Sequence, residues 1–288
     1  MTLFEALHAH PWFLYLTVVL FGLCVGSFLN VVIYRLPKMM EAQWQAECAA
    51  LAGKDPQPAE VFNLVHPRSR CPGCGKQITA LQNIPVASWL YLGGKCASCK
   101  TPISLRYPAV EVAAALLAAL MAWRFGYSGA LAGALVFAWA LLALTFIDLD
   151  TQLLPDDITL PLLWAGLIAN TFGAFTDLRS AVLGAVGGYL LLWLVYWGFK
   201  LLAKKEGMGY GDFKLLAALG AWLGWQVLPF VVLVSAGVGA IVGGIALWLS
   251  KRGMETRIPF GPYLALGGLA GLMVGRHAVI WWIGYFPR

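Results

Sequence analysis

The stretch Gly207-Met208-Gly209-Tyr210-Gly211-Asp212-Phe213-Lys214 brings three glycines and an aspartate to the start of an apolar, helix-forming run. Glycine tolerates positive φ and permits the close approach of another backbone, so the pattern predicts a tight turn with Asp212 at a helix start. A carboxylate there is favoured by the helix dipole, and the glycines leave room for an extended peptide. An ordinary N-cap aspartate behind a glycine turn would have the same pattern. The stretch alone leaves both interpretations open.

A second group of acids follows another apolar run, in Phe146-Ile147-Asp148-Leu149-Asp150-Thr151-Gln152-Leu153-Leu154-Pro155-Asp156. Acids at a membrane boundary are costly, and they usually face water or serve a function. The residues that compete with Asp148 as the partner of Asp212 are Asp150, Asp156 and Asp157. Periodicity does not choose between Asp148 and Asp150. Asp156 has a simple structural interpretation as a turn or N-cap residue that opens the next helix.

Composition predicts a membrane protein. The chain has 288 residues, of which 60% are hydrophobic and 12% charged, and its mean hydropathy is +0.74. Soluble domains of this size are less apolar, and the apolar residues fall into runs long enough to cross a bilayer. We therefore expect an all-α polytopic membrane protein with about eight transmembrane helices. The predicted spans are approximately 12–34, 108–124, 130–147, 158–176, 180–200, 213–224, 227–249 and 260–284.

The basic residues predict the orientation of the chain. A formal charge of +6 would also suit nucleic-acid binding, but most of the Lys and Arg lie in loops on one side of the spans, as the positive-inside rule expects. We therefore expect contact with membrane lipid, no nucleic acid, both termini in the periplasm and a cytoplasmic long loop. The expected domains are a first span (1–35), a cytoplasmic loop domain (36–106) that opens with an amphipathic helix at about 38–51, and a transmembrane core (107–288).

The number of crossings places the acids on one face. Two spans separate the long loop from Asp148, and two more separate Asp148 from Asp212. An even number of crossings returns the chain to the same face, so the loop and both acids share one membrane surface. Two carboxyl groups at similar depth suit peptide hydrolysis without a metal, because one takes a proton from water while the other donates one to the carbonyl oxygen.

Two other classes of protein fit parts of this pattern. A transporter would use the acids as an ion or proton path, although such acids would stand near mid-bilayer on broken helices, ideally in repeated halves. An assembly scaffold built on the long loop, without catalysis, would tolerate replacement of both aspartates. The position of the acids beside a glycine turn, at one face, favours a peptidase.

Cys71-Pro72-Gly73-Cys74 and Cys96-Ala97-Ser98-Cys99 form two CxxC pairs in the long loop. Each pair suits a turn that presents two thiolates, and four thiolates complete a closed tetrahedral zinc site. Disulfides are the alternative, which a cytoplasmic location disfavours. Because four thiolates leave no open position for water, we expect a structural zinc that supports folding of the loop domain.

Together the motifs resemble the type IV prepilin peptidases, which are membrane aspartyl proteases of the GxGD type. The GxGD aspartate corresponds to Asp212, and the first catalytic acid of that family, seven residues before the proline, corresponds to Asp148. The resemblance covers nearly the whole chain. Further family-like stretches are Gly26-Ser27-Phe28-Leu29-Asn30-Val31-Val32, Asn83-Ile84-Pro85, Ser88-Trp89-Leu90 and Arg106-Tyr107-Pro108-Ala109-Val110-Glu111.

The resemblance implies a bacterial inner-membrane enzyme that cuts the basic leader from prepilins or pseudopilins after a glycine. Family members with a tetracysteine loop also methylate the new N-terminal amine, usually of phenylalanine, with S-adenosylmethionine. Gly94-Lys95 matches a family pattern associated with methylation, although a glycine turn that leads into a zinc knuckle would look the same. Composition and spacing show no methyl-donor site, so a peptidase without methylation remains the alternative. Glu111 is an unexplained acid that either pairs with Arg106 or faces the protein interior.

Overall fold

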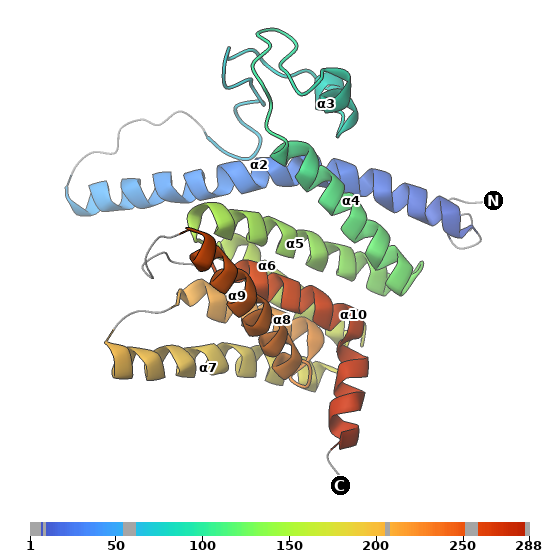
Figure 1. Ribbon diagram of the computed structural model, residues 1–288, viewed down its shortest axis with the longest axis vertical. Coiled ribbons are helices and arrows are strands. Elements are labelled where there is room, and N and C mark those ends of the chain that lie inside the picture. Colours follow the sequence, from blue (N-terminus) through green and yellow to red (C-terminus); the bar gives the residue numbers. More distant parts are fainter. Residues whose placement is uncertain (1–6, 8–9, 54–61, 205–207, 251–258, 286–288) are drawn as a thin grey trace. The chain divides into compact units, whose positions relative to one another are not determined.

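The computed structural model describes residue 7 and residues 10–53, 62–204, 208–250 and 259–285. The elements in this part of the chain are helices, accompanied by two isolated β-bridges. The all-helical fold predicted from composition is therefore confirmed (Figure 1). Gly207, the first glycine of the predicted turn, lies outside the described residues. The helices are α2 (Pro11–Leu51), the 3-10 helix η1 (Leu81–Asn83), α3 (Ala87–Tyr91), α4 (Arg106–Phe125), α5 (Gly129–Thr151), α6 (Asp156–Thr171), α7 (Leu178–Ala203), α8 (Tyr210–Leu223), α9 (Leu228–Ser250) and α10 (Gly261–Tyr285).

Within the described residues, five helices are long and apolar enough to cross a membrane. They are α2, α4, α5, α7 and the Leu228–Ile245 portion of α9. By comparison, α6 and α8 have 16 and 14 residues, and the apolar Gly261–Gly275 portion of α10 is also shorter. The chain is therefore a multi-pass membrane protein, and length and composition give five candidate spans in the described part of the chain.

The first long helix differs from the prediction. The sequence predicts a span that ends near Arg35 and a separate amphipathic helix, whereas α2 continues through Pro37 to Leu51. At 1.5 Å per residue its 41 residues extend about 60 Å, about twice the thickness of the hydrocarbon core. Proline removes one backbone donor and bends a helix without ending it when good helix formers follow, as they do from Met39 onward.

The chain divides into two compact units, Met1–Leu131 and Ala132–Arg288. In the first unit α2 packs against α4, and the loop that carries α3 lies beyond the N-terminal end of α4 (Figure 1). Small residues permit this packing. A Cβ atom at Gly22 would lie 2.9 Å from Cα of Ala115, and one at Gly26 would lie 2.6 Å from Cα of Glu111. Close approach of this kind is typical of helices that pack in lipid.

In the second unit α8 is the central helix, and it contacts α6, α7, α9 and α10. From Asp212 to Leu223 every residue except Lys214 is buried, which explains why this short helix is apolar on nearly all sides. Its C-terminal end is held by buried polar groups. The Asn170 side chain donates to the carbonyl oxygens of Ala221 and Trp222, at 2.8 and 3.1 Å. The position of α8 fixes the N-terminal end that carries Asp212.

Candidate active site and metal centre

Asp148 lies near the C-terminal end of α5 and is only 5% exposed. Its Oδ2 atom accepts a hydrogen bond of 2.9 Å from the backbone N–H of Gly261, the first residue of α10. That N–H has no partner within the helix, and a carboxylate is the favoured acceptor at a helix N-terminus. A Cβ atom at Gly261 would lie 2.6 Å from the same oxygen. Glycine is therefore required there for Asp148 to reach the backbone.

Asp212 is the third residue of α8 and is 7% exposed. The predicted helix start is confirmed, because α8 begins at Tyr210. The sequence predicts that the glycines provide both positive φ and space for close approach, and only the need for space is confirmed. Gly209 has φ −82°, and Gly211 is helical and is not among the glycines with positive φ. At Gly211 the requirement is space, because a Cβ atom there would lie 2.8 Å from Cβ of Leu154.

These segments bring the two acids together. The carboxyl groups of Asp148 and Asp212 are near enough to interact electrostatically. Leu154, in the loop between α5 and α6, packs beside both glycines, since a Cβ atom at Gly261 would also lie 3.1 Å from its Cδ2 atom. The ends of α5, α8 and α10 therefore converge on one pair of buried carboxyl groups.

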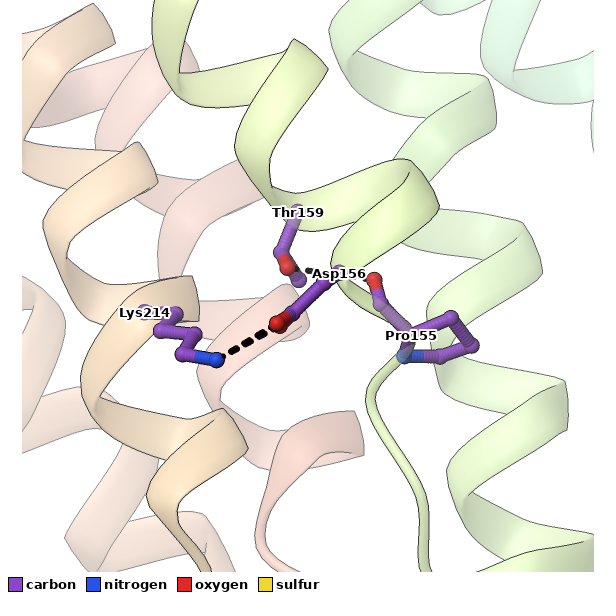
Figure 2. Close-up of polar contacts among 4 residues, drawn as sticks. All are labelled: Pro155, Asp156, Thr159 and Lys214. Carbon is purple, nitrogen blue, oxygen red and sulfur yellow. Dashed lines mark hydrogen bonds and ion pairs between the residues drawn. The ribbon is translucent and has the colours of Figure 1, made fainter. Parts of the chain in front are cut away.

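The competing acids have different surroundings. Asp150 and Asp157 are exposed, whereas Asp148 is buried, and this difference distinguishes positions that periodicity leaves equivalent. Asp156 is not an N-cap, because Pro155 occupies that position and Asp156 is the first residue of α6. Figure 2 shows that Asp156 instead pairs with Lys214 of α8, whose Nζ atom lies 2.8 and 2.6 Å from its two carboxylate oxygens. The pair joins the N-terminal parts of α6 and α8.

The four loop cysteines form a cluster in the first unit. Their sulfur atoms all lie within 4.8 Å of one another, and the Sγ atoms of Cys71 and Cys99 are 3.6 Å apart. None is in a disulfide. Two similar turns present the pairs: Gly75 N–H donates to the carbonyl oxygen of Cys71, and Lys100 N–H donates to that of Cys96. Four sulfurs bound to zinc at about 2.3 Å would be about 3.8 Å apart, so the spacing fits a tetrahedral site.

Hydrogen bonds prepare part of this cluster for a cation. Those from the side chain and backbone of Thr101 lower the pKa of the Cys99 thiol to about 6. A backbone hydrogen bond from Lys76 lowers the pKa of the Cys74 thiol. The neighbouring thiols and desolvation act in the opposite direction, and the pKa is raised to about 11. A bound cation favours the thiolate form of every ligand, so metal binding would release the protons that the thiols retain.

Gly94 and Lys95 immediately precede the second cysteine pair. Gly94 has φ +67°, and a Cβ atom there would lie 2.8 Å from the ring of Trp89. Glycine is therefore required by both conformation and space. The Lys95 side chain is exposed.

Glu111 faces the protein interior, which is one of the two environments that the sequence predicts for it. It is 8% exposed, and its Oε2 atom accepts a hydrogen bond of 2.7 Å from the backbone N–H of Val86.

Sequence reasoning missed the residues whose role is to support the acids. Gly261 follows Phe260 and precedes Pro262 at the start of an apolar run, and this pattern was a usable sign of a helix N-terminus. The partnership of Lys214 with Asp156 and that of Glu111 with Val86 had no local sign, because each joins segments that are distant in sequence.

Comparisons with known proteins bear on the family of the chain. The chain matches two family profiles, the bacterial peptidase A24 N-terminal domain at residues 20–125 and the type IV leader peptidase family at residues 135–244. Both aspartates of the pair fall in the second match, and the four cysteines fall in the first. No solved structure matches the chain significantly.

Curated relatives extend the similarity to nearly the full length. A prepilin leader peptidase/N-methyltransferase of Pseudomonas aeruginosa is 55% identical over 276 residues, which are 96% of this chain and 95% of the relative. One of Aeromonas hydrophila is 52% identical over 286 residues, 99% of each chain. The corresponding enzyme of Burkholderia pseudomallei is 53% identical over 261 residues, which are 89% of this chain and 84% of the relative. The resemblance inferred from the motifs is confirmed, and the chain belongs to the type IV leader peptidase family, among the prepilin leader peptidase/N-methyltransferases.

Proposed function

We propose that this chain removes the leader peptide of prepilins or pseudopilins and then methylates the new N-terminal amine. The observation that carries the proposal is the match, over nearly the full length, to relatives whose names state both activities. The chain is accordingly an enzyme, and the transporter and scaffold interpretations are not needed. The alternative that remains within the family is a peptidase without methylation.

Asp148 and Asp212 are the proposed catalytic carboxyl groups. Their burial, their electrostatic interaction and the supporting contacts of Gly211 and Gly261 favour this pair over the exposed acids. Two carboxyl groups at close range favour a state in which they share one proton. One carboxylate takes a proton from water, whose oxygen attacks the scissile carbonyl carbon, while the other carboxyl donates its proton to the carbonyl oxygen. Collapse of the tetrahedral intermediate breaks the C–N bond, and the departing amine receives a proton.

The hydrogen bond from Gly261 to Asp148 has a clear consequence in this mechanism. It leaves Oδ2 occupied and directs the other oxygen of the carboxyl group to the reaction, so a single orientation is maintained. The wall formed by Leu154 against Gly211 sets how closely a substrate backbone approaches Asp212.

The cysteine cluster is the proposed zinc site, with Cys71, Cys74, Cys96 and Cys99 as ligands. A cation bound to four thiolates supplies folding energy to a loop that contains little secondary structure. It has no open position for water, so hydrolysis is assigned to the aspartates alone.

Methylation requires a methyl donor, and S-adenosylmethionine is the donor that we propose. Gly94 and Lys95 are the proposed donor-binding residues. They lie in the first unit, beside the cysteine cluster, whereas both proposed catalytic acids lie in the second. The two activities therefore depend on different parts of the chain.

The proposed setting is the bacterial inner membrane. We retain about eight spans, a cytoplasmic loop domain at 36–106, a transmembrane core at 107–288, and both termini in the periplasm. Asp148 and Asp212 then lie near the cytoplasmic surface. A prepilin-like substrate suits this depth, because its basic leader remains in the cytoplasm while the apolar segment behind the cut lies in the bilayer. Membrane lipid and the substrate are the expected partners, and nucleic acid is not.

The test is incubation of the purified full-length protein with a leader-bearing prepilin and S-adenosylmethionine, followed by mass spectrometry of the product. The expected product lacks the leader and carries one added methyl group. An unmodified cleaved product would support the peptidase alone, and an intact substrate would contradict the proposal.

A further inference from the structure

Glu111 is a buried acid that the cleavage mechanism does not use. It lies near the N-terminal end of α4, in a helix that is a candidate membrane span, and is 8% exposed. An acid in such a helix is costly unless its oxygens are satisfied. Here the carboxyl group accepts the Val86 N–H at 2.7 Å, and the side chain of Ser27 in α2 is near enough to stabilise its charged form. The carboxyl group therefore links the α2–α4 pair to the loop.

The residue that Glu111 holds has an unusual backbone conformation. Val86 has φ 58° and ψ −50°, and Ala87 N–H donates to the carbonyl oxygen of Pro85 at 2.5 Å. These are the features of a γ-turn with positive φ, which is rare and strained. Positive φ is a particular outlier for a β-branched side chain. Such a conformation persists only where the surroundings hold it, and the inference from strain runs from the outlier to a function.

The strained turn fixes the position of α3, since Val86 is its N-cap residue. In α3, the Trp89 ring occupies the space beside Gly94, and its Nε1 atom donates to the carbonyl oxygen of Ile103 at 3.2 Å. Gly94 is held from both sides: its N–H donates to Trp89 at 2.9 Å, and its carbonyl oxygen accepts from Ile103 at 2.7 Å. A continuous series of contacts therefore joins Glu111 to the Gly94–Lys95 turn.

We propose that Glu111 is a positioning residue for methyl transfer. By holding Val86 in its strained turn, it fixes α3 and so sets the geometry in which the Gly94–Lys95 turn binds the methyl donor. This inference rests on the proposed methyltransferase function. Every residue in the series belongs to the first unit, and the two proposed catalytic aspartates belong to the second. Loss of Glu111 should therefore impair methylation and spare cleavage.

The experiment compares Glu111→Ala, Glu111→Gln and a matched control, Glu47→Ala, which removes an exposed acid of α2. Full-length enzymes receive a pilin that already has a free N-terminal phenylalanine, so that methylation does not depend on prior cleavage. The KM for S-adenosylmethionine, the rate of leader cleavage on intact prepilin, and the zinc content are measured. Glutamine retains an acceptor oxygen for the Val86 N–H, whereas alanine does not.

We expect Glu111→Ala to raise the KM for S-adenosylmethionine by about tenfold, the effect of losing one hydrogen bond to a charged group. Cleavage rate and zinc content should remain within about twofold of wild type, a change too small to indicate a lost interaction. Glu111→Gln should restore most of the donor affinity, and Glu47→Ala should match wild type.

Three results would overturn the inference. A normal KM in Glu111→Ala would show that the donor does not depend on this link. A glutamine variant as impaired as the alanine variant would show that the acid acts by its charge and not by positioning the turn. Parallel loss of cleavage, methylation and zinc would reduce Glu111 to a general folding role. Failure of the proposed methyltransferase function would look different from failure of this inference. In that case the wild-type enzyme itself would cleave the leader and leave the free amine unmethylated, and the inference would be rejected together with the proposed function.

Discussion

Substitution of Gly211 tests how closely the active-site segments are packed. An ideal Cβ atom at this position lies 2.8 Å from Cβ of Leu154, whereas ordinary contacts begin at 3.4 Å. The backbone of Gly211 or that of Leu154 must therefore move by about 0.6 Å. When the backbone of Gly211 moves, the adjacent residue Asp212 moves with it. A displacement of about 1 Å in a catalytic group costs about a hundredfold in rate. We expect Gly211→Ala to slow leader cleavage by about tenfold and Gly211→Val by about a hundredfold or more.

Stability should change less than activity. Overpacking costs about 1–3 kcal/mol, and replacing a helical glycine by alanine regains about 0.5–1 kcal/mol. Gly198 provides a matched control, because it is a helical glycine of the same unit with no atom within 4 Å of an added Cβ. Cleavage kinetics are measured on detergent-purified variants of equal folded yield. Wild-type rates in Gly211→Val, or equal losses in Gly198→Ala, would refute the view that this contact shapes the active site.

Three further outcomes are expected. Gly261→Ala should slow cleavage by at least about tenfold with normal folded yield, because its Cβ atom would displace the Asp148 carboxylate; an unchanged rate would contradict the role of that hydrogen bond. Cys71→Ser/Cys74→Ser should lose the zinc found by metal analysis of wild type, and equal zinc in both proteins would remove the site. Asp156→Asn should slow cleavage by less than about fivefold, because its ion pair with Lys214 is partly exposed and such pairs contribute about 1 kcal/mol or less; a loss comparable to that of Asp148→Asn would contradict this ranking.

Much of the fold was predictable because hydropathy and helix signals are local. The predicted span at 108–124 corresponds to α4, Arg106–Phe125, and that at 227–249 corresponds to α9, Leu228–Ser250. The start of α8 followed from the change between a glycine turn and an apolar run at Asp212. The predicted break between the first span and a separate amphipathic helix is wrong, because helix formers follow Pro37 and α2 continues to Leu51.

The candidate site was predictable only in part. Residue types and the order of motifs indicated Asp148 and Asp212, and burial then distinguishes Asp148 from Asp150. The supporting contacts are tertiary and have no sign in the local sequence. Gly261 reaches Asp148 across 113 positions of the chain, and Glu111 meets Val86 across 25. The space required at Gly211 likewise depends on where Leu154 packs, which periodicity does not specify.

The central claim is that Asp148 and Asp212 together carry out hydrolysis. Its most direct test is the rate of prepilin leader cleavage by Asp148→Asn and Asp212→Asn, with Asp150→Asn as the control for an exposed acid of the same helix. Asparagine preserves size but does not exchange the catalytic proton, so we expect each of the two variants to lose at least about a thousandfold in rate. The control should stay within about threefold of wild type, as expected for a group outside the reaction. Normal cleavage by Asp148→Asn, together with inactivity of Asp150→Asn, would contradict the account.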